Sequence, residues 1–600
     1  MTAQRDALRV QDHGNGIFTA PGARIIDRTG RKRLPIGDDG FTRAAAGSIV
    51  VDKTMLIADI LDSGYTATLF CRPRRFGKTL NMTMLRAFLE VPVGRESFAP
   101  LFIGTEVWEA DGGRYRGDFE RYPVVYISMR TAKGRTWRDT YGALKNTIAA
   151  EYARHRYLAE SPRLSDADRA FVRRIASGEG QAEEYADSLM RLTRMLKEHH
   201  GQGSVVLIDE YDAPVMAGYS LDGSGYYDEV VGFLKRWLTG ALKDGGEALA
   251  FACLTGVQRI SKESIFSDLN NLVVNTALST EFDERFGFTD DEVAALAAYL
   301  GDPGCMPEAR EWYDGYRFGK IDVYNPWSVI NFLKQDCVSD VYWGNTSSNG
   351  VVADLLRHAD QATLQQVYRL LEPGGEVVSP IDLSVVFPDI GVKPGALWSM
   401  LYLAGYLTTP DTSLPNNVLA PRRLRIPNHE VSVLYRTEVV ERFASISGGR
   451  DRLAALHAAI AAGDEGVAAS ELTRIFRDSA SVFDLTSENG VHMLVLGLLF
   501  GMPGYGDPLS NREHGAGRPD IRVEPVRTPF PYGDRPLVTI ELKFARDAEG
   551  PELSELARSG LEQIAQRGYD AGELPAEAVG RMRWGIAANG KLVAVASERA

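Results

Sequence analysis

The sequence has few cysteines, no long apolar run and no apolar segment at its start. None of the four cysteines forms a CxxC pair, which argues against a structural zinc site and a disulfide framework; they are Cys71, Cys253, Cys305 and Cys337. The longest apolar run near the C-terminus, VHMLVLGLLFGM, is too short to cross ~30 Å of hydrocarbon. The first residues lack the apolar core of a signal peptide. We therefore expect a cytoplasmic protein without a membrane-spanning segment.

The composition is that of an ordinary globular protein, with 44% hydrophobic and 24% charged residues. A chain of 600 residues is too long for one hydrophobic core, so we expect roughly three or four domains. The formal charge of −13 argues against a chain that coats nucleic acid through bulk charge. A local basic groove remains open, because binding depends on where the cations lie.

Residues 34–290 alternate short β-rich runs with amphipathic helical segments, after a polar, Gly-rich and loose lead-in at residues 1–33. The alternation predicts an α/β domain, in which helices cover both faces of a parallel sheet. The nearly continuous apolar character of the runs supports burial on both sides. The predicted strands are residues 66–71, 122–129, 204–209, 249–256 and 271–276.

Residues 291–480 are mainly helical. Thr289 and Glu292 have the spacing of a capping box at a helix start. A helix, a strand pair and a further helix suit a small winged-helix-like module, and Gly463 divides a helical hairpin. From residue 481 to 600 the pattern changes to a long helix, two strands rich in Val and Ile, a helix and a last strand pair.

A phosphate-binding loop is indicated by the stretch TATLFCRPRRFGKTLNMTMLRAFLE, residues 66–90. Gly77, Lys78 and Thr79 fill the last three places of GxxxxGK[ST], between a predicted buried strand and a predicted helix. In this motif backbone N–H groups surround phosphate, the lysine binds the β- and γ-phosphates, and the hydroxyl binds Mg²⁺. Arg72 occupies the place of the first glycine and cannot freely take a positive φ, so the turn must differ. Arg75 adds a cation that favours anions.

Two further apolar strands end in polar residues. SVVLIDEYDAP places Asp209 at a strand tip, where a P-loop ATPase holds Mg²⁺ and its water, and Glu210 next to it as a candidate general base. LAFACLTGVQRISKES places Thr255 at the end of another strand, where it could sense the γ-phosphate. Arg259 could stabilise transferred charge. Two solvated acids and a surface ion pair of Arg259 remain the alternatives.

Several stretches in combination resemble the bacterial AAA-ATPase-like family: VDKTMLI, FCRPRRFGKTLNM, VVLIDEYDAP, LTGVQRISKESIFSDLNNL, WYDGYRFG, VYNPWSV and YWGNTSSNG. The resemblance covers roughly residues 33–600. It implies a P-loop sheet of the AAA/ASCE type at 34–290, a linker domain at 291–480, and a restriction-endonuclease-like PD-(D/E)XK domain at 481–600. The RPRRFGKT form of the loop is usual in this family, so the resemblance implies a nucleotide site. It also places Asp52, Lys53 and Thr54 beside the nucleotide.

A carboxylate–lysine pattern lies on two strands near the C-terminus, in GRPDIRVEP and PLVTIELKFA. Period-two alternation puts Glu541 and Lys543 on one face of the second strand. If the strands pair across the loop at 526–536, Asp520 approaches Glu541, and two adjacent carboxylates suit Mg²⁺. Lys543 could then position or deprotonate a water against a phosphodiester. A solvated polar strand face is the alternative.

Similarity to the PD-(D/E)XK fold implies that Asp520, Glu541 and Lys543 form the core of this site. Gln563 on the following helix and Glu488 on the preceding helix are additional candidates. The stretch NREHGAGR adds Arg512 and Arg518 and flexible glycines suited to a backbone phosphate, although a solvated turn fits it equally well. His514 is expected to be exposed.

The sequence therefore predicts an ATPase that uses ATP and Mg²⁺ as cofactors, fused to a nuclease whose expected partner is DNA, with RNA as a further candidate. The helical middle would transmit nucleotide state. The alternatives are a nucleotide-operated switch or scaffold whose C-terminal domain binds without cleaving, and, last, a small-molecule phosphotransferase. An arginine that enters a neighbour's site would make the protein a homo-oligomer.

Overall fold

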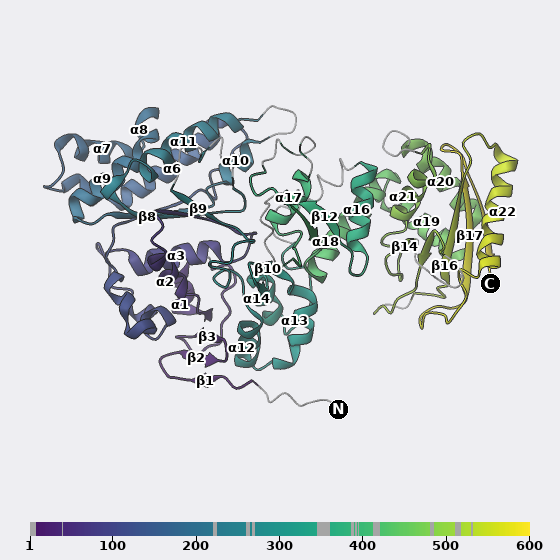
Figure 1. Cartoon of the computed structure of the whole chain (residues 1–600), viewed down its shortest axis with the longest axis horizontal. Coiled ribbons are helices and arrows are strands. Elements are labelled where there is room, and N and C mark those ends of the chain that lie inside the picture. The colour runs from purple at the N-terminus through teal and green to yellow at the C-terminus, as the bar shows by residue number, and fades with distance from the viewer. Residues whose placement is uncertain are drawn as a thin grey trace. The chain divides into compact units, whose positions relative to one another are not determined.

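The computed structural model describes residues 8–38, 40–219, 225–259, 265–266, 271–344, 360–385, 389, 393, 395–411, 420–479, 485–510, 518–529 and 532–600 (Figure 1). The chain divides into two compact units. The first unit consists of Met1–Asn345 with Val378–Glu430, and the second of Thr346–Val377 with Val431–Ala600. The domain boundaries that the sequence suggests near residues 34, 291 and 481 remain predictions.

The first unit contains a five-stranded sheet in which every neighbouring pair is parallel. The sequence prediction of a parallel α/β sheet is thus confirmed for this region. All residues of β5 and β7 are buried, as expected for strands covered on both faces. The strand order is β6 (Val124–Ser128), β7 (Ser204–Asp209), β8 (Leu249–Gly256), β5 (Ala67–Cys71) and β9 (Leu272–Asn275).

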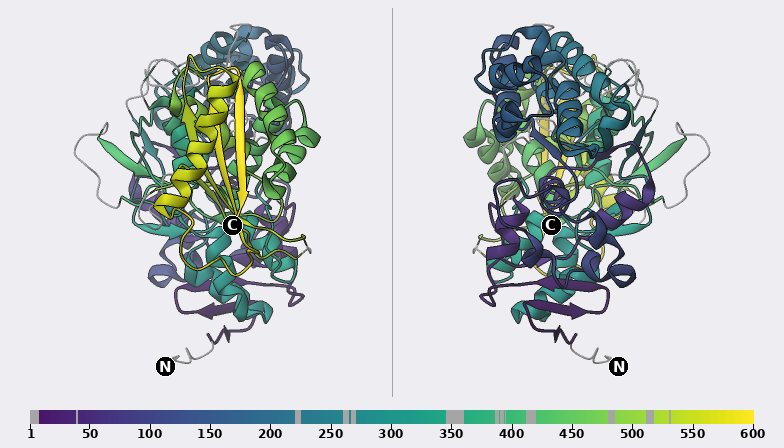
Figure 2. Two further views of the ribbon diagram at one scale, coloured as in Figure 1. Left: turned by 90° about the vertical axis from the view of Figure 1, so that its right-hand side faces the viewer. Right: turned by 90° about the vertical axis from the view of Figure 1, so that its left-hand side faces the viewer.

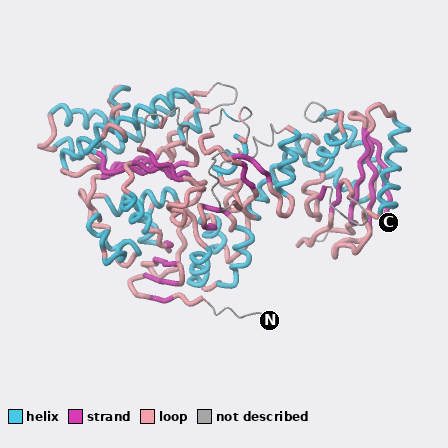
Figure 3. The backbone as a smooth tube through the Cα atoms, viewed as in Figure 1, coloured by secondary structure: helices cyan, strands magenta, loops and turns pink. Residues whose placement is uncertain are grey.

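Helices lie on both sides of this sheet, as Figure 3 shows by colour. Three of them lie on one side: α1 (Phe41–Gly47), α2 (Met55–Ser63) and α3 (Lys78–Leu89). Five others lie on the opposite side: α6 (Trp137–Arg154), α7 (Asp166–Ala176), α8 (Ala182–Ala186), α9 (Ser188–His200) and α11 (Tyr227–Leu242). Short helices fill the connections: α4 (Ala99–Phe102), α5 (Glu106–Glu109) and α10 (Ala213–Gly218).

Residues 8–33 are not the loose lead-in that the sequence suggested. A four-stranded antiparallel sheet is formed by β1 (Gln11–Asp12), β2 (Ile17–Ala20), β3 (Ala23–Ile26) and β4 (Val50–Val51). Pro21 and Gly22 make the turn between two short apolar strands, and the glycines that suggested looseness mark such turns. The Tyr299 hydroxyl donates to Asp27 at 3.0 Å, which ties this sheet to the helical region that follows.

That helical region completes the first unit. The predicted capping box is present, because the Glu292 N–H donates to Thr289 Oγ1 at 3.3 Å and the Thr289 N–H donates to Glu292 Oε2 at 2.8 Å. Its helices are α12 (Asp290–Leu300), α13 (Met306–Tyr313), α14 (Pro326–Lys334) and α17 (Ala396–Ala404). Two small sheets pair β10 (Tyr316–Phe318) with β11 (Ile321–Val323) and β12 (Val377–Pro380) with β13 (Pro421–Leu424). The winged-helix-like arrangement remains a prediction.

The second unit contains another five-stranded sheet. Its order is β14 (Leu509–Ser510), β15 (Ile521–Val523), β16 (Leu537–Phe544), β17 (Arg581–Ala588) and β18 (Val593–Arg599). Only β16 and β17 are parallel, and α22 (Gly550–Arg567) connects them. Figure 2 (left) shows α22 in yellow beside this sheet.

Further helices complete the second unit. They are α16 (Gln361–Leu371), α18 (His429–Ile446), α19 (Arg450–Ala462), α20 (Glu465–Ser479) and α21 (Glu488–Leu498). Of these, α20 packs against β18, α21 against β16 and α16 against α21. Gly463 ends α19 with a φ of 81°, as the predicted hairpin requires. Across the described ranges, no helix of either unit is both long enough and apolar enough to span a bilayer.

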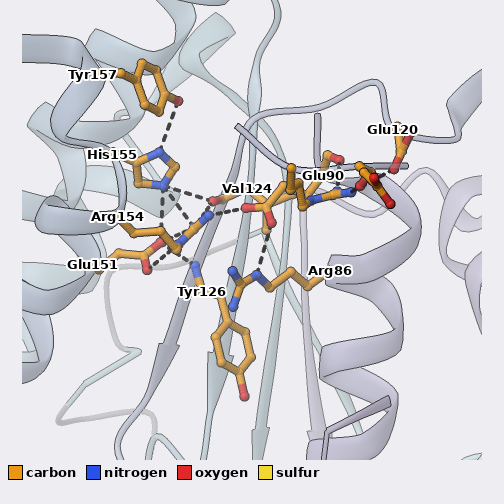
Figure 4. A network of polar contacts seen from close by, with 11 residues as sticks. Arg86, Glu90, Glu120, Val124, Tyr126, Glu151, Arg154, His155 and Tyr157 are labelled. Atoms are coloured by element: carbon orange, nitrogen blue, oxygen red, sulfur yellow. Dashed lines mark hydrogen bonds and ion pairs between the residues drawn. The ribbon is translucent and has the colours of Figure 1, made fainter. Parts of the chain in front are cut away.

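The edge strand β6 of the first sheet is covered by charged side chains of α6 (Figure 4). The Tyr126 N–H donates to Glu151 Oε1 at 2.8 Å, and Arg154 donates to the Val124 carbonyl. Arg154 also pairs with Glu151 and with Glu90, which follows α3. An exposed strand edge would otherwise leave these backbone groups open to pairing with another chain. The buried Glu151 carboxylate and the half-buried Arg154 guanidinium therefore close the edge.

This network predicts a loss of stability in acid. Burial raises the pKa of Glu151, but Arg154 and His155 outweigh burial and hold the pKa at about 2, against 4.5 for an unperturbed glutamate. A lowered folded-state pKa stabilises the fold above about pH 4.5, and this contribution is lost as the pH falls toward 2. We expect a loss of about 3 kcal/mol over that interval.

Urea denaturation of the full chain between pH 7 and pH 3 measures the part of this loss that falls above pH 3, about 2 kcal/mol. Glu151→Gln should lower stability at pH 7 and flatten the pH dependence, whereas the exposed Glu198→Gln should leave both unchanged. Equal pH dependence in the wild type and in Glu151→Gln would contradict the assignment.

Candidate active sites

The first candidate site begins where β5 ends and α3 starts. The Arg72 N–H donates to the Gly256 carbonyl at 3.1 Å and so continues the pairing of β5 with β8 for one more residue. The chain turns later, because positive φ values occur at Arg75 (69°) and at Gly77 (78°). The loop thus turns at these two residues, and the place of the first consensus glycine needs no positive φ.

Lys78 is the first residue of α3, and its side chain is buried. Its Nζ donates to the carbonyls of Arg72 at 3.0 Å and Pro73 at 2.7 Å. Burial lowers the pKa of Lys78, while the acid Glu210 acts in the opposite direction. The lysine therefore lies inside the loop, held by two carbonyl oxygens that phosphate oxygens can replace.

Asp209 lies at the end of β7 and is fully buried. Thr79 Oγ1 donates to its Oδ2 at 2.7 Å, and Thr255 Oγ1 donates to its Oδ1 at 2.6 Å. The carboxyl ends of parallel strands meet at one edge of a sheet, which brings residues from β5–α3, β7 and β8 together. The structure thus joins three residues that the sequence singled out separately, although the Thr255 hydroxyl is directed at Asp209.

Glu210 follows with a φ of 52°, a conformation that costs energy for a residue with a side chain. Its N–H donates to Thr255 Oγ1 at 3.3 Å. Burial raises the pKa of Glu210, Lys78 lowers it, and Asp209 raises it further. A raised pKa makes this carboxylate a stronger base than a solvated one.

Two residues that follow β7, Tyr211 and Asp212, were not among those predicted from the sequence. Asp212 is buried and accepts from the Val257 N–H at 2.7 Å and from the Gln258 N–H at 3.1 Å. The Tyr211 hydroxyl donates to the Gln258 carbonyl at 2.7 Å. They fix the loop that leads from β8 to Arg259, whose buried Nε has no hydrogen-bond partner among the described residues.

The segment expected beside the nucleotide, Asp52 to Thr54, makes contacts within the first unit, and its role toward a nucleotide remains a prediction. Asp52 accepts from the Thr54 N–H at 2.9 Å and from the Glu106 N–H at 2.8 Å. Lys53 pairs with Glu292 at 2.6 Å and also borders a pocket of about 80 Å³ beside Gly77. Most of the pocket wall is apolar and includes Leu34, Phe41, Val51, Phe288, Pro326 and Ile330.

Arg75 was expected at the phosphates. In the structure its guanidinium carbon lies 4.3 Å from the ring centroid of Trp327, in cation–π geometry. Its role toward a nucleotide remains a prediction.

The second candidate site is formed in the second unit, where β15 and β16 pair antiparallel as the sequence suggested. The register Ile521↔Ile540 places Asp520 opposite Glu541. The Leu542 N–H donates to Asp520 Oδ2 at 2.7 Å. The strand pair therefore positions both carboxylates at one end of β15.

Helix α22 completes this site with Gln563. Lys543 Nζ donates to Gln563 Oε1 at 2.7 Å and to Glu541 Oε1 at 3.2 Å. The Gln563 amide also donates to Glu541 Oε1 and, at 3.3 Å, to the Tyr569 hydroxyl. Four residues that the sequence indicated, Asp520, Glu541, Lys543 and Gln563, thus lie together, and Tyr569 is a partner that the sequence did not indicate.

Close packing of α22 depends on glycine. A Cβ atom at Gly585 of β17 would lie 1.8 Å from the Ala557 carbonyl oxygen, and one at Gly560 would lie 3.6 Å from Glu541 Cβ. The helix backbone therefore rests directly on the sheet, which brings Gln563 within reach of Lys543.

The second oxygen of Glu541 suits a cation. Glu541 Oε2 is buried and has no hydrogen-bond partner among the residues that the structure describes. Burial, followed by the nearby Asp520, raises the pKa of Glu541 to about 7. A buried carboxylate oxygen without a donor costs free energy, which a divalent cation would recover. The donor set therefore fits Mg²⁺.

Both candidate metal sites offer few protein ligands. In the described part of the chain, no three or more His, Cys, Asp or Glu side chains gather closely enough to hold a metal ion. Mg²⁺ commonly uses one or two carboxylates and completes its shell with water and phosphate oxygens. Thr79 with Asp209, and Asp520 with Glu541, are compatible with that pattern.

The remaining candidates lie around the second site. Glu488 begins α21, and on the same helix burial lowers the pKa of His492, while Asp520 and Glu488 raise it. His492 Nε2 lies 2.9 Å from Ser510 Oγ. Arg512 and His514 lie outside the described residues, and Arg518 lies just inside them.

A comparison with known protein families bears on the N-terminal region. Residues 35–266 match a family described as predicted AAA-ATPase. An uncharacterized protein in the vnfD 5′ region of Azotobacter chroococcum mcd 1 is 29% identical over 421 residues, which are 69% of this chain and 71% of the relative. The solved structure of a Walker-type ATPase of Pyrococcus abyssi is similar with a TM-score of 0.37 and 14% sequence identity. The match covers 66% of this chain and 98% of that ATPase. The family match and the parallel sheet make the N-terminal region AAA-ATPase-like.

Proposed function

We propose that the AAA-ATPase-like region binds and hydrolyses ATP, and that the second unit cleaves phosphodiester bonds of nucleic acid, with DNA as the expected substrate. The observation that carries the first part is the joint position of Lys78, Thr79 and Asp209 at the carboxyl edge of a parallel sheet. Thr79 and Asp209 already share a hydrogen bond of 2.7 Å.

Each residue of the first site has a role in this proposal. Lys78 exchanges the carbonyls of Arg72 and Pro73 for the β- and γ-phosphates. Thr79 and Asp209 would hold Mg²⁺, which offsets phosphate charge when bound. Glu210 accepts a proton from the attacking water or orients it.

The pocket beside Gly77 supports a nucleotide as the ligand. It adjoins the first turn of α3 through Leu80 and Asn81 and is walled mainly by apolar side chains. A planar base can be buried there while its phosphates reach the helix N-terminus, where backbone N–H groups favour anions. We propose that this pocket receives the adenine.

The observation that carries the second part is the buried Glu541 Oε2 beside Asp520 and Lys543. Asp520 and Glu541 would hold Mg²⁺, which offsets charge on the scissile phosphate when bound. Lys543 positions a water for attack, and Gln563 holds Lys543 in place at 2.7 Å. This proposal follows from the arrangement of carboxylates and lysine rather than from the comparisons.

Cleavage of labelled DNA and RNA by the full chain, with Mg²⁺ or Mn²⁺, tests the second part. The wild type should cleave, and Asp520→Ala should not. Binding of nucleic acid without cleavage by the wild type, under either metal, would favour a nucleotide-operated switch or scaffold instead. Absence of ATP turnover in the same preparation would contradict the first part.

A further inference from the structure

Arg72 does not extend toward the place where phosphates would bind. Its side chain is fully buried behind the loop. Nη1 donates to the carbonyls of Cys71 at 3.0 Å and Asn275 at 3.1 Å, and Nη2 donates to Asn275 Oδ1 at 2.6 Å. The guanidinium thus joins the end of β5 to the end of β9, two neighbouring strands of the sheet.

Aromatic rings flank this cation, and the charge of Asp283 also favours its protonated form. Its guanidinium carbon lies 5.1 Å from the ring centroid of Phe286 and 5.0 Å from that of Phe318. Burial lowers the pKa of Arg72 to about 10, so the side chain remains a cation at neutral pH. Three neutral oxygens and two ring faces therefore compensate a buried charge, an arrangement that depends on exact placement of the guanidinium.

Neighbouring residues of the loop rest on the same region. Phe76 is fully buried, with its ring centroid 4.9 Å from that of Tyr316 and 5.1 Å from that of Phe318. A Cβ atom at Gly405 would lie 2.7 Å from Pro73 Cβ, so the backbone there comes close to the loop. The loop is thus supported from behind by side chains where other P-loops use glycine turns.

We propose that Arg72 is a positioning residue for nucleotide binding, which holds the phosphate loop in shape by fastening it to Asn275 and the Phe286–Phe318 ring pair. This inference rests on the proposed ATP site. The link to the ligand is direct, because the carbonyl oxygens of Arg72 and Pro73 are the ones that hold Lys78. A loop that shifts at Arg72 misplaces both Lys78 and the backbone donors.

Arg72→Lys tests the proposal, because it keeps the charge but cannot reach all three acceptors in one plane. We expect the KM for ATP to rise about tenfold or more and kcat to fall as well, because the displaced Lys78 serves both binding and turnover. Leu144→Ala, in the buried face of α6, is the matched control: it lowers the unfolding temperature without moving KM.

Asn275→Ala provides a second variant that leaves Arg72 intact and removes its Oδ1 acceptor, together with the hydrogen bond from Asn275 Nδ2 to the Glu281 carbonyl. Like Arg72→Lys, it should weaken ATP binding, which is measured as a higher Kd in a titration with a fluorescent ATP analogue. This variant decides the question if Arg72→Lys does not fold. A Kd within about twofold of the wild type in the folded variants, together with a fall in unfolding temperature like that of Leu144→Ala, would overturn the proposal.

The same titration separates this inference from the proposed function. No binding of the ATP analogue by the wild type would overturn both. Wild-type binding that is lost in Lys78→Ala but unchanged in Arg72→Lys and Asn275→Ala would leave the ATP site standing and overturn only the role of Arg72.

Discussion

Replacing Lys78 by alanine should reduce ATP turnover about 100-fold or more, because the variant loses the one buried ammonium group of the phosphate loop. In the structure Lys78 Nζ is already desolvated and bonded to two carbonyl oxygens, so the charge is in place before the nucleotide arrives. Burial lowers the pKa of Lys78, and a triphosphate would restore it. Release of inorganic phosphate from ATP by the full chain measures the effect.

Lys243→Ala, an exposed lysine at the end of α11, serves as the control and should turn over ATP like the wild type. Turnover in Lys78→Ala within about threefold of the control would show that the nucleotide site lies elsewhere. Glu210→Gln in the same assay examines the proposed base: binding should remain while turnover falls.

Glu541→Gln should abolish cleavage of nucleic acid and, in EDTA, stabilise the second unit at pH 8. The folded-state pKa of about 7 exceeds the ordinary 4.5, so the charged carboxylate is disfavoured in the fold above about pH 7. The glutamine side chain of the variant has the shape of the glutamate, carries no charge and can still accept a hydrogen bond from Lys543. We expect a gain of about 2 kcal/mol at pH 8 that vanishes below about pH 4.5. Urea denaturation in EDTA at both pH values measures it.

Glu562→Gln is the matched control for this experiment, since Glu562 is exposed on α22 one residue before Gln563. It should change neither stability nor cleavage. A Glu541→Gln protein that cleaves within about tenfold of the wild type would remove Glu541 from the proposed site. A variant that is less stable at pH 8 would show that Glu541 is already compensated without metal.

The sequence predicted those parts of the fold that depend on local pattern. Continuous apolar runs located all five strands of the first sheet, and period-two alternation placed Glu541 and Lys543 on one face of β16. The residues of the first site followed from strand ends, because parallel strands end at a common edge, whereas those of the second followed from the antiparallel pairing of β15 with β16 and from the family resemblance. Thr79, Asp209 and Thr255 lie far apart in the sequence, yet this rule was sufficient to bring them together.

Contacts between distant segments were not predictable in this way. Asn275, which binds Arg72, lies 203 residues away and has no pattern that links it to the loop. Asp212 and Tyr211 hold the β8 loop through backbone groups, which leave no trace in residue spacing. The sequence did not predict the strands β1–β3, because short apolar segments joined by two-residue turns resemble a Gly-rich loop.

The most direct test of the account counts bound divalent metal, since both proposed sites hold one beside phosphate. Electron paramagnetic resonance of Mn²⁺ with the full chain should reveal one site without nucleotide, absent in Glu541→Gln, and a second that requires ATP and is absent in Asp209→Asn. Equal Mn²⁺ binding by the wild type and both variants, with and without ATP, would contradict the account.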